Sequence, residues 1–170
     1  MVKPSVAGVD ENAIPDELFG GNILATRDGV GPDDTYPVIA DALGVEQIRY
    51  PGGSLTECYL RLSDPDIDEV TNVGTGEPCE FLSMSEFMGW AEETGRAVNI
   101  VLPTRTQLSE NRDANGERFA DVNEEELRGF LRDTLDGAYG DPPIQAFEIG
   151  NEYWGSGEMS STEYGRVAGE

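Results

Sequence analysis

The side chains best suited to chemistry lie near the end of the chain, in residues 145–154 (Gln-Ala-Phe-Glu-Ile-Gly-Asn-Glu-Tyr-Trp). A short apolar run stops at a glycine and is followed by Asn151, Glu152, Tyr153 and Trp154. This pattern is typical of a buried strand whose end presents an amide, a carboxyl group and two rings. Glu152 is therefore a candidate general acid or base, a role that requires a carboxyl group within reach of the reacting atom.

The absence of histidine narrows the chemistry further. It removes the Ser-His-Asp triad, the Cys-His pair and histidine ligands for a metal, so acid–base work falls to carboxylates or tyrosines. Residues 64–68 and 111–116 resemble the start of calcium loops, but Thr75 and Val122 stand where such loops carry a glutamate. We interpret both stretches as surface turns and predict no metal and no cofactor.

Composition indicates one globular domain with an unusual charge. The 170 residues are 38% hydrophobic, and 34 Asp and Glu stand against 11 Lys and Arg, for a net charge of −23. This charge argues against nucleic acid and against anionic membrane surfaces as partners, because both attract clustered cations. It suits a saline medium, where salt screens self-repulsion, or an ordinary acidic secreted enzyme. No apolar stretch approaches the ~20 residues of a membrane span.

The N-terminus shows no signal peptide, because no basic segment is followed by an apolar one. A mature or excised segment would look the same, and we expect an extracellular or secreted protein. Cys58 and Cys79 lie in a segment rich in loop residues. A disulfide between them and two free thiols both remain open.

The elements that must position Glu152 are predicted as four repeats of a strand followed by a helix. The strands are expected at residues 19–25, 45–50, 97–102 and 144–150. The helix starts are expected at Asp34 or Thr35 and at the capping boxes Ser83–Glu86, Asn123–Glu126 and Ser160–Glu163. Gly44, Gly95 and residues 141–143 are the expected stops for the first three helices. Residues 54–82 and 104–121 are predicted to be long polar connections.

Strands that alternate with helices predict a parallel sheet with right-handed crossovers. Four units fill 170 residues, so eight would need about 340, within the size range of a TIM barrel. We predict an α/β fold consisting of the N-terminal half, four βα units, of a (β/α)8 TIM barrel. Residues 1–170 then form one partial barrel domain that ends inside the fourth helix. The alternative is a self-contained open sheet with two exposed edges.

In a barrel, the active site lies at the carboxyl ends of the strands. The four predicted ends supply Asn22, Arg49, Arg105 and the Asn151-Glu152 pair. An acid, amides, cations and aromatic rings suit a sugar, which offers hydroxyls for hydrogen bonds and C–H faces for stacking.

Two motifs carry a resemblance to a known group of enzymes. Phe-Glu-Ile-Gly-Asn-Glu at the fourth strand and Arg-Tyr-Pro-Gly-Gly at residues 49–53 resemble the clan A glycoside hydrolases, especially the α-L-arabinofuranosidase-like families. These are retaining enzymes on a (β/α)8 barrel, and the order and spacing of the four units also fit. The resemblance implies that Glu152 protonates the glycosidic oxygen and then deprotonates the incoming water. It implies that Asn151 binds the sugar hydroxyl beside the anomeric carbon.

The resemblance also implies further substrate contacts. Arg49 matches an arginine near the family's nucleophile, and Trp154 resembles a platform for a sugar ring. Tyr153 and Asn22 complete the candidate substrate-binding residues. A structural role stays open for each of them: Arg49 neutralising Glu148, the two aromatics packing against the fourth helix, and Asn22 serving as an ordinary loop residue.

The second carboxylate is missing from these four units, since the family's nucleophile follows a seventh strand. Glu148 precedes Glu152 by four residues, ~13 Å along a strand, whereas retaining hydrolysis needs two carboxyls ~5–5.5 Å apart. We expect Glu148 to have a structural role inside the barrel, paired with Arg49 or a similar cation. We therefore expect an inactive fragment of a retaining glycoside hydrolase that cleaves O-glycosidic bonds in a poly- or oligosaccharide.

Its expected partners are a carbohydrate substrate and either the missing half barrel or a second copy, bound through exposed strand edges. The alternative function is a non-catalytic carbohydrate-binding or scaffold module of an extracellular protein.

Overall fold

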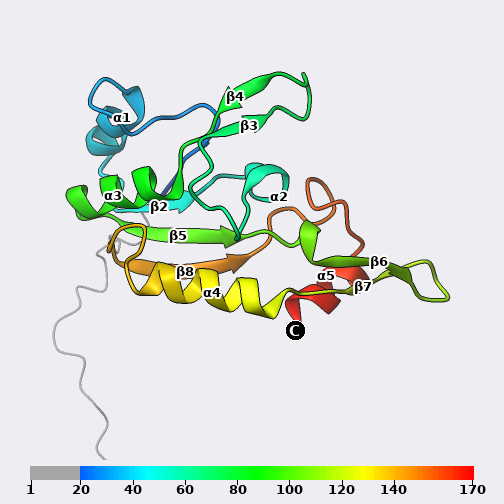
Figure 1. Ribbon diagram of the computed structural model, residues 1–170. Coiled ribbons are helices and arrows are strands. Elements are labelled where there is room, and N and C mark those ends of the chain that lie inside the picture. Colours follow the sequence, from blue (N-terminus) through cyan, green and yellow to red (C-terminus); the bar gives the residue numbers. More distant parts are fainter. Residues whose placement is uncertain (1–19) are drawn as a thin grey trace, which may run out of the picture.

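The computed structural model describes residues 20–170 (Figure 1), and Phe19 of the predicted first strand lies outside them. The prediction of an α/β fold with a parallel sheet is confirmed. The four strands lie in the order β1-β2-β5-β8, and each neighbouring pair is parallel. Their bounds are Gly20–Asn22 for β1, Gln47–Tyr50 for β2, Ala97–Leu102 for β5 and Ile144–Ile149 for β8.

The predicted helix starts are confirmed. The four predicted helices are α1 (Thr35–Leu43), α3 (Met84–Thr94), α4 (Glu124–Leu135) and α5 (Ser161–Ala168). Ser83 and Ser160 form the expected capping boxes with the glutamates three residues later. Gly44 and Gly95 end α1 and α3 in the left-handed conformation that glycine adopts at low cost.

Helix α4 differs from its prediction at both ends. The Asn123 side chain accepts the Glu126 N–H, but the Asn123 N–H donates to Gln107, at 3.1 Å, and not to the Glu126 carboxylate. The reciprocal half of the predicted capping box is therefore absent. The helix also ends at Leu135, before residues 141–143, because Gly137 follows with a φ of 77°.

The two long connections contain short elements that the sequence did not predict. Residues 54–82 contain the short helix α2 (Leu55–Tyr59) and a hairpin of β3 (Glu69–Thr71) and β4 (Pro78–Glu80). Residues 104–121 contain a turn of 3₁₀ helix (Arg105–Gln107) and a hairpin of β6 (Leu108–Arg112) and β7 (Arg118–Ala120). Both follow carboxyl ends of sheet strands, and the β6–β7 hairpin projects beyond the sheet (Figure 1).

One face of the sheet is buried against the helices. Ile48, Tyr50, Val98 and Ile100 alternate along β2 and β5 and are all 0% exposed. The Tyr50 ring stacks on Phe87 of α3 at 4.6 Å, and its hydroxyl donates to a backbone carbonyl. Burial raises the pKa of Tyr50 far above its usual value. Residues of α1, α3 and α4 join this same core, so these helices cover the same side of the sheet.

The opposite face of the sheet carries polar and small side chains. Arg49, Asn99 and Ala146 occupy one register across three strands, and Glu148 lies two residues further along β8. None of these four residues is fully buried. Within residues 20–170, β1 and β8 each pair with one strand only, so both edges of the sheet are unpaired.

Both cysteines are free thiols in this structure, which decides between the two alternatives that the sequence left open. Partial burial raises the pKa of the Cys58 thiol. Within the part of the chain that the structure describes, no helix combines the length and the apolar character of a membrane span.

Candidate functional site

Arg49 is the centre of the candidate site. It projects from β2 on the open face and donates to three residues from other strands or strand ends. Its Nε lies 2.8 Å from Glu148 Oε2, its Nη2 lies 3.2 Å from Asn151 Oδ1, and its Nη1 lies 3.5 Å from Asn22 Oδ1. The predicted pairing of Glu148 with Arg49 is confirmed. Three of the predicted substrate-binding residues are thus brought together at the carboxyl end of the sheet.

The turn after β2 requires a glycine at position 52. The φ of Gly52 is 96°, and a Cβ atom there would lie 1.8 Å from the carbonyl oxygen of Ile23. The backbone beyond β1 therefore passes directly against this turn, and Ala25 N–H donates to the Pro51 carbonyl at 3.0 Å. The Arg-Tyr-Pro-Gly-Gly motif accordingly fixes how the ends of β1 and β2 meet.

Glu152 lies in a tight turn that leaves its carboxyl group available. Its φ of 43° is left-handed, which costs a non-glycine residue about 1–3 kcal/mol. Its carbonyl accepts the N–H of Gly155 at 2.7 Å, which closes the turn. The Glu152 side chain is exposed, and among residues 20–170 no hydrogen bond or ion pair engages it. A strained backbone that presents an unengaged carboxyl group is consistent with a reactive role.

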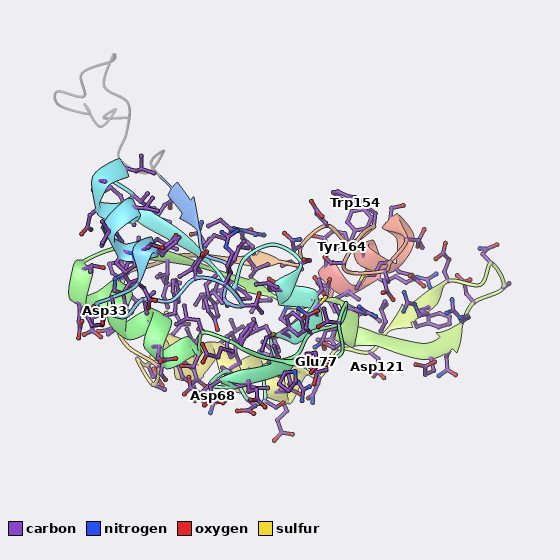
Figure 2. All side chains as sticks on the ribbon, turned by 90° about the horizontal axis from the view of Figure 1, so that it is seen from above. Asp33, Asp68, Glu77, Asp121, Trp154 and Tyr164 are labelled. Atoms are coloured by element: carbon purple, nitrogen blue, oxygen red, sulfur yellow. The ribbon has the colours of Figure 1, made fainter. Side chains whose placement is uncertain are left out.

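The two aromatic residues have different environments. Tyr153 stacks on Tyr164 of α5 at 4.7 Å, as the helix-packing alternative predicted. Trp154 meets Tyr153 edge-on at 5.0 Å and is 68% exposed, beside Tyr164 in Figure 2. Among residues 20–170, no hydrogen bond or ring contact joins Trp154 to the cluster of Arg49, Asn22, Glu148 and Asn151 (the Arg49 group). Trp154 offers an open ring, while Tyr153 connects that ring to α5.

Sequence reasoning missed one carboxylate at the site, Glu57 of α2. Its side chain is only 4% exposed and accepts hydrogen bonds from Thr104, Arg105 and Asn151. A glutamate within the largely apolar run Leu-Thr-Glu-Cys-Tyr-Leu was the available signal. This signal was missed because helix α2 was not predicted.

A cavity in the structure lies away from these residues. The cavity, of about 620 Å³, is lined by residues 25–31 and by parts of β3, β4 and the start of α3, and neither Arg49 nor Glu152 lines it. Three carboxylates that line this cavity accept hydrogen bonds from nearby backbone N–H groups. Asp28 accepts the Leu24 N–H, Asp34 accepts the Gly31 N–H, and Glu86 caps α3. The Arg49 group instead occupies an open sheet face, and we favour it because its polar groups converge.

The two calcium-like stretches have structural partners. Asp66 accepts hydrogen bonds from the backbone and side chain of Ser85, at 2.8 and 2.7 Å. Asp113 accepts two backbone N–H groups of its own turn and pairs with Arg166, which lowers its pKa. Among residues 20–170, no three Cys, Asp or Glu side chains gather as metal ligands would.

Comparison with known proteins found no matching family model, no matching curated protein and no matching solved structure.

Proposed function

We propose that this chain forms four βα units of the (β/α)8 barrel of a retaining glycoside hydrolase, with Glu152 as the general acid/base. One observation carries the proposal. Arg49 holds the side chain of Asn151 at the carboxyl end of a parallel sheet, next to the exposed carboxyl group of Glu152. This is where barrel enzymes carry their active sites.

The topology supports a barrel over a doubly wound sheet. The strands follow one another across the sheet in chain order, whereas a doubly wound sheet reverses direction at a switch point. The helices α1, α3 and α4 share one core on one face. The other face is polar and both edges are unpaired, as expected when further strands complete the sheet into a barrel.

The proposed chemistry uses the free groups of the Asn151-Glu152 pair. Asn151 Oδ1 accepts from Arg49, which leaves its amide N–H groups to donate to a sugar hydroxyl. Glu152 would protonate the glycosidic oxygen as the bond to the leaving group breaks, and would then take a proton from the attacking water. The exposed ring of Trp154 offers a stacking surface for a neighbouring sugar.

The nucleophile is proposed to come from outside these four units. Retaining hydrolysis needs a second carboxylate, ~5–5.5 Å from the first. Glu148 is bound to Arg49, and Glu57 is buried under four hydrogen bonds. Both are already engaged in holding the strand ends together. By its resemblance to the family's strand-two arginine, Arg49 would lie near the missing carboxylate, with its charge shared between that group and Glu148.

The charge distribution favours an uncharged saccharide. The net charge is −23, and the arginines at the strand ends are already paired, Arg49 with Glu148 and Arg105 with Glu158. A uronate or sulfated sugar would meet net repulsion, and neither of these two arginines is unpaired. A neutral saccharide therefore fits best.

A non-catalytic carbohydrate-binding module is the second candidate. The engagement of Glu148 and Glu57 favours it, since it leaves Glu152 without a carboxylate partner among the described strand ends. Turnover separates the two functions. The longest natural protein that contains this chain hydrolyses an aryl glycoside if it is an enzyme, and binds saccharides without turnover if it is a module.

Saccharide binding by the chain itself tests the site that both candidates share. We expect calorimetric titration to show binding of xylohexaose or cellohexaose and much weaker binding of oligogalacturonate. Asn151→Ala should weaken binding about tenfold, because it removes the amide donor. Arg128→Ala is the matched control, since Arg128 forms an exposed pair on α4. Equal binding by wild type and Asn151→Ala would refute this site.

A further inference from the structure

Glu57 is an unusual charged group for a protein interior. It lies in α2, directly after the turn that ends β2, and its side chain is 4% exposed. Within residues 20–170 it has no ion-pair partner, although a buried carboxylate is costly without a cation or several hydrogen bonds. Hydrogen-bond donors must therefore offset the free-energy cost of burying this carboxylate.

Those donors come from the ends of two neighbouring strands. Glu57 Oε2 accepts the backbone N–H groups of Thr104 and Arg105, at 2.9 and 2.7 Å. Glu57 Oε1 accepts the Thr104 hydroxyl at 2.9 Å and the Asn151 N–H at 3.0 Å. Four hydrogen bonds to one carboxyl group thus join α2 to the ends of β5 and β8.

Glu57 accepts backbone N–H groups that have no hydrogen-bond partner in the sheet. The last backbone bond between β8 and β5 is from Gly150 N–H to the Leu102 carbonyl, at 2.9 Å. Beyond it the strands diverge, and the N–H groups of Thr104 and Asn151 would be unsatisfied without Glu57. One carboxylate therefore replaces the next step of the ladder on both strands.

The packing around this carboxylate leaves little room for movement. Gly150 has a φ of 71°, and a Cβ atom there would lie 2.8 Å from Thr104 Oγ1 and 3.2 Å from Glu57 Oε1. Asn151 is then held at two points, its N–H by Glu57 and its side chain by Arg49. The direction in which the chain enters Glu152 is fixed by the same contacts.

We propose that Glu57 is a positioning residue for the saccharide site: by fixing the Asn151 backbone, it orients the Asn151 amide and the Glu152 carboxyl group toward the ligand. This inference rests on the proposed saccharide function. It predicts that Glu57 affects ligand affinity through geometry, without touching the ligand.

The test compares wild type with Glu57→Gln in the same 170-residue chain. Glutamine keeps the shape, but its NH₂ group faces donors where an oxygen accepted two hydrogen bonds. We expect the affinity for xylohexaose or cellohexaose to fall about tenfold or more, and the amide resonances of Thr104, Arg105 and Asn151 to shift in the ¹H–¹⁵N spectrum. All measurements are made well below the melting temperature of each variant.

Glu163→Gln is the matched control, because Glu163 is also a 4% exposed, multiply hydrogen-bonded carboxylate, but on α5. It should lower stability while leaving saccharide affinity and the Asn151 resonance unchanged. A merely structural role for Glu57 would, as in this control, leave the saccharide affinity of the folded variant unchanged.

The outcomes separate the two claims. If wild type binds no neutral saccharide, the proposed function fails and the positioning role fails with it. If wild type binds and folded Glu57→Gln binds equally well, only the positioning role is overturned. If Glu57→Gln does not fold, Thr104→Val replaces it, since it removes only the hydroxyl donor to Oε1. That variant should weaken binding about two- to fivefold and shift the Asn151 amide, and an unchanged affinity and resonance would overturn the proposal.

Discussion

Asn151 shows how a single residue is placed by groups far away in the sequence. Its side chain is held by Arg49 of β2 and its backbone N–H by Glu57 of α2. Arg49 and Asn151 were predicted because both belong to motifs at the ends of recognisable strands. Glu57 was not predicted, because helix α2 was not predicted and no local pattern says which distant amides a glutamate will meet.

The close packing at the end of β8 gives a prediction for Gly150. Gly150→Ala should lower the free energy of unfolding by about 1–3 kcal/mol, because alanine disfavours a φ of 71° and its methyl group would meet Thr104 and Glu57. Urea denaturation of the chain measures the change. Gly165→Ala is the control, since Gly165 lies within α5 with no atom near its added Cβ, and it should be neutral or stabilising. Equal stability of the two variants would contradict this packing.

At the scale of elements, the β6–β7 hairpin is attached to α5 mainly by charged groups. Glu163 of α5 accepts from the Arg118 side chain at 2.8 and 2.9 Å and from its N–H at 2.8 Å. Arg166 of α5 pairs with Asp113 in the hairpin turn and lies over the ring of Phe119. The hairpin beyond β5 is therefore fixed beside the 150–160 loop by ion pairs, with little apolar burial.

This attachment predicts a pH-dependent contribution to stability. The Arg118 hydrogen bonds lower the pKa of Glu163 to about 2 from a usual value of 4.5. A depressed pKa means that the stabilisation is complete above about pH 4.5 and is lost as the pH falls toward 2. Glu163→Gln should therefore destabilise the chain by roughly 2–3 kcal/mol at pH 6, and the difference from wild type should shrink as the pH approaches 2.

Urea denaturation at pH 6, 4 and 3 measures this difference. Glu124→Gln, which breaks an exposed pair on α4, should cost less than about 0.5 kcal/mol at every pH. A Glu163→Gln effect that stayed constant down to pH 3 would show that the ionised carboxylate is not what holds the hairpin.

The elements themselves were predictable to different degrees. Strands β5 and β8 and the capped helices have strong local signals: six-residue segments rich in apolar side chains, capping residues and terminal glycines. The hairpins were missed because strands such as Glu69–Thr71 and Arg118–Ala120 are three residues long and polar. Their pairing depends on turns at Gly76 and Gly116 and on contacts with distant elements, which no local pattern encodes.

At the scale of the molecule, the acidic surface limits what the chain can bind. Asp33, Asp68, Glu77 and Asp121 lie spread over the molecule in Figure 2, and the net charge is −23. Two copies of the chain would repel each other at low ionic strength, so we favour the other half of one barrel over a second copy as the partner of the free edges of β1 and β8. The sequence predicted the parallel sheet, because alternating strands and helices specify it, but no local pattern says what pairs with the edges of β1 and β8.

The assignment of Glu152 as general acid is tested most directly by leaving-group dependence, in the longest natural protein that contains this chain. Glu152→Gln should lower kcat/KM for an oligosaccharide about 10²–10⁴-fold, because its alkoxide leaving group needs a proton. For a dinitrophenyl glycoside, whose leaving group departs without one, the loss should be small. Glu158→Gln, in the same loop and paired with Arg105, should leave both rates unchanged. Unimpaired oligosaccharide hydrolysis by Glu152→Gln would contradict the account.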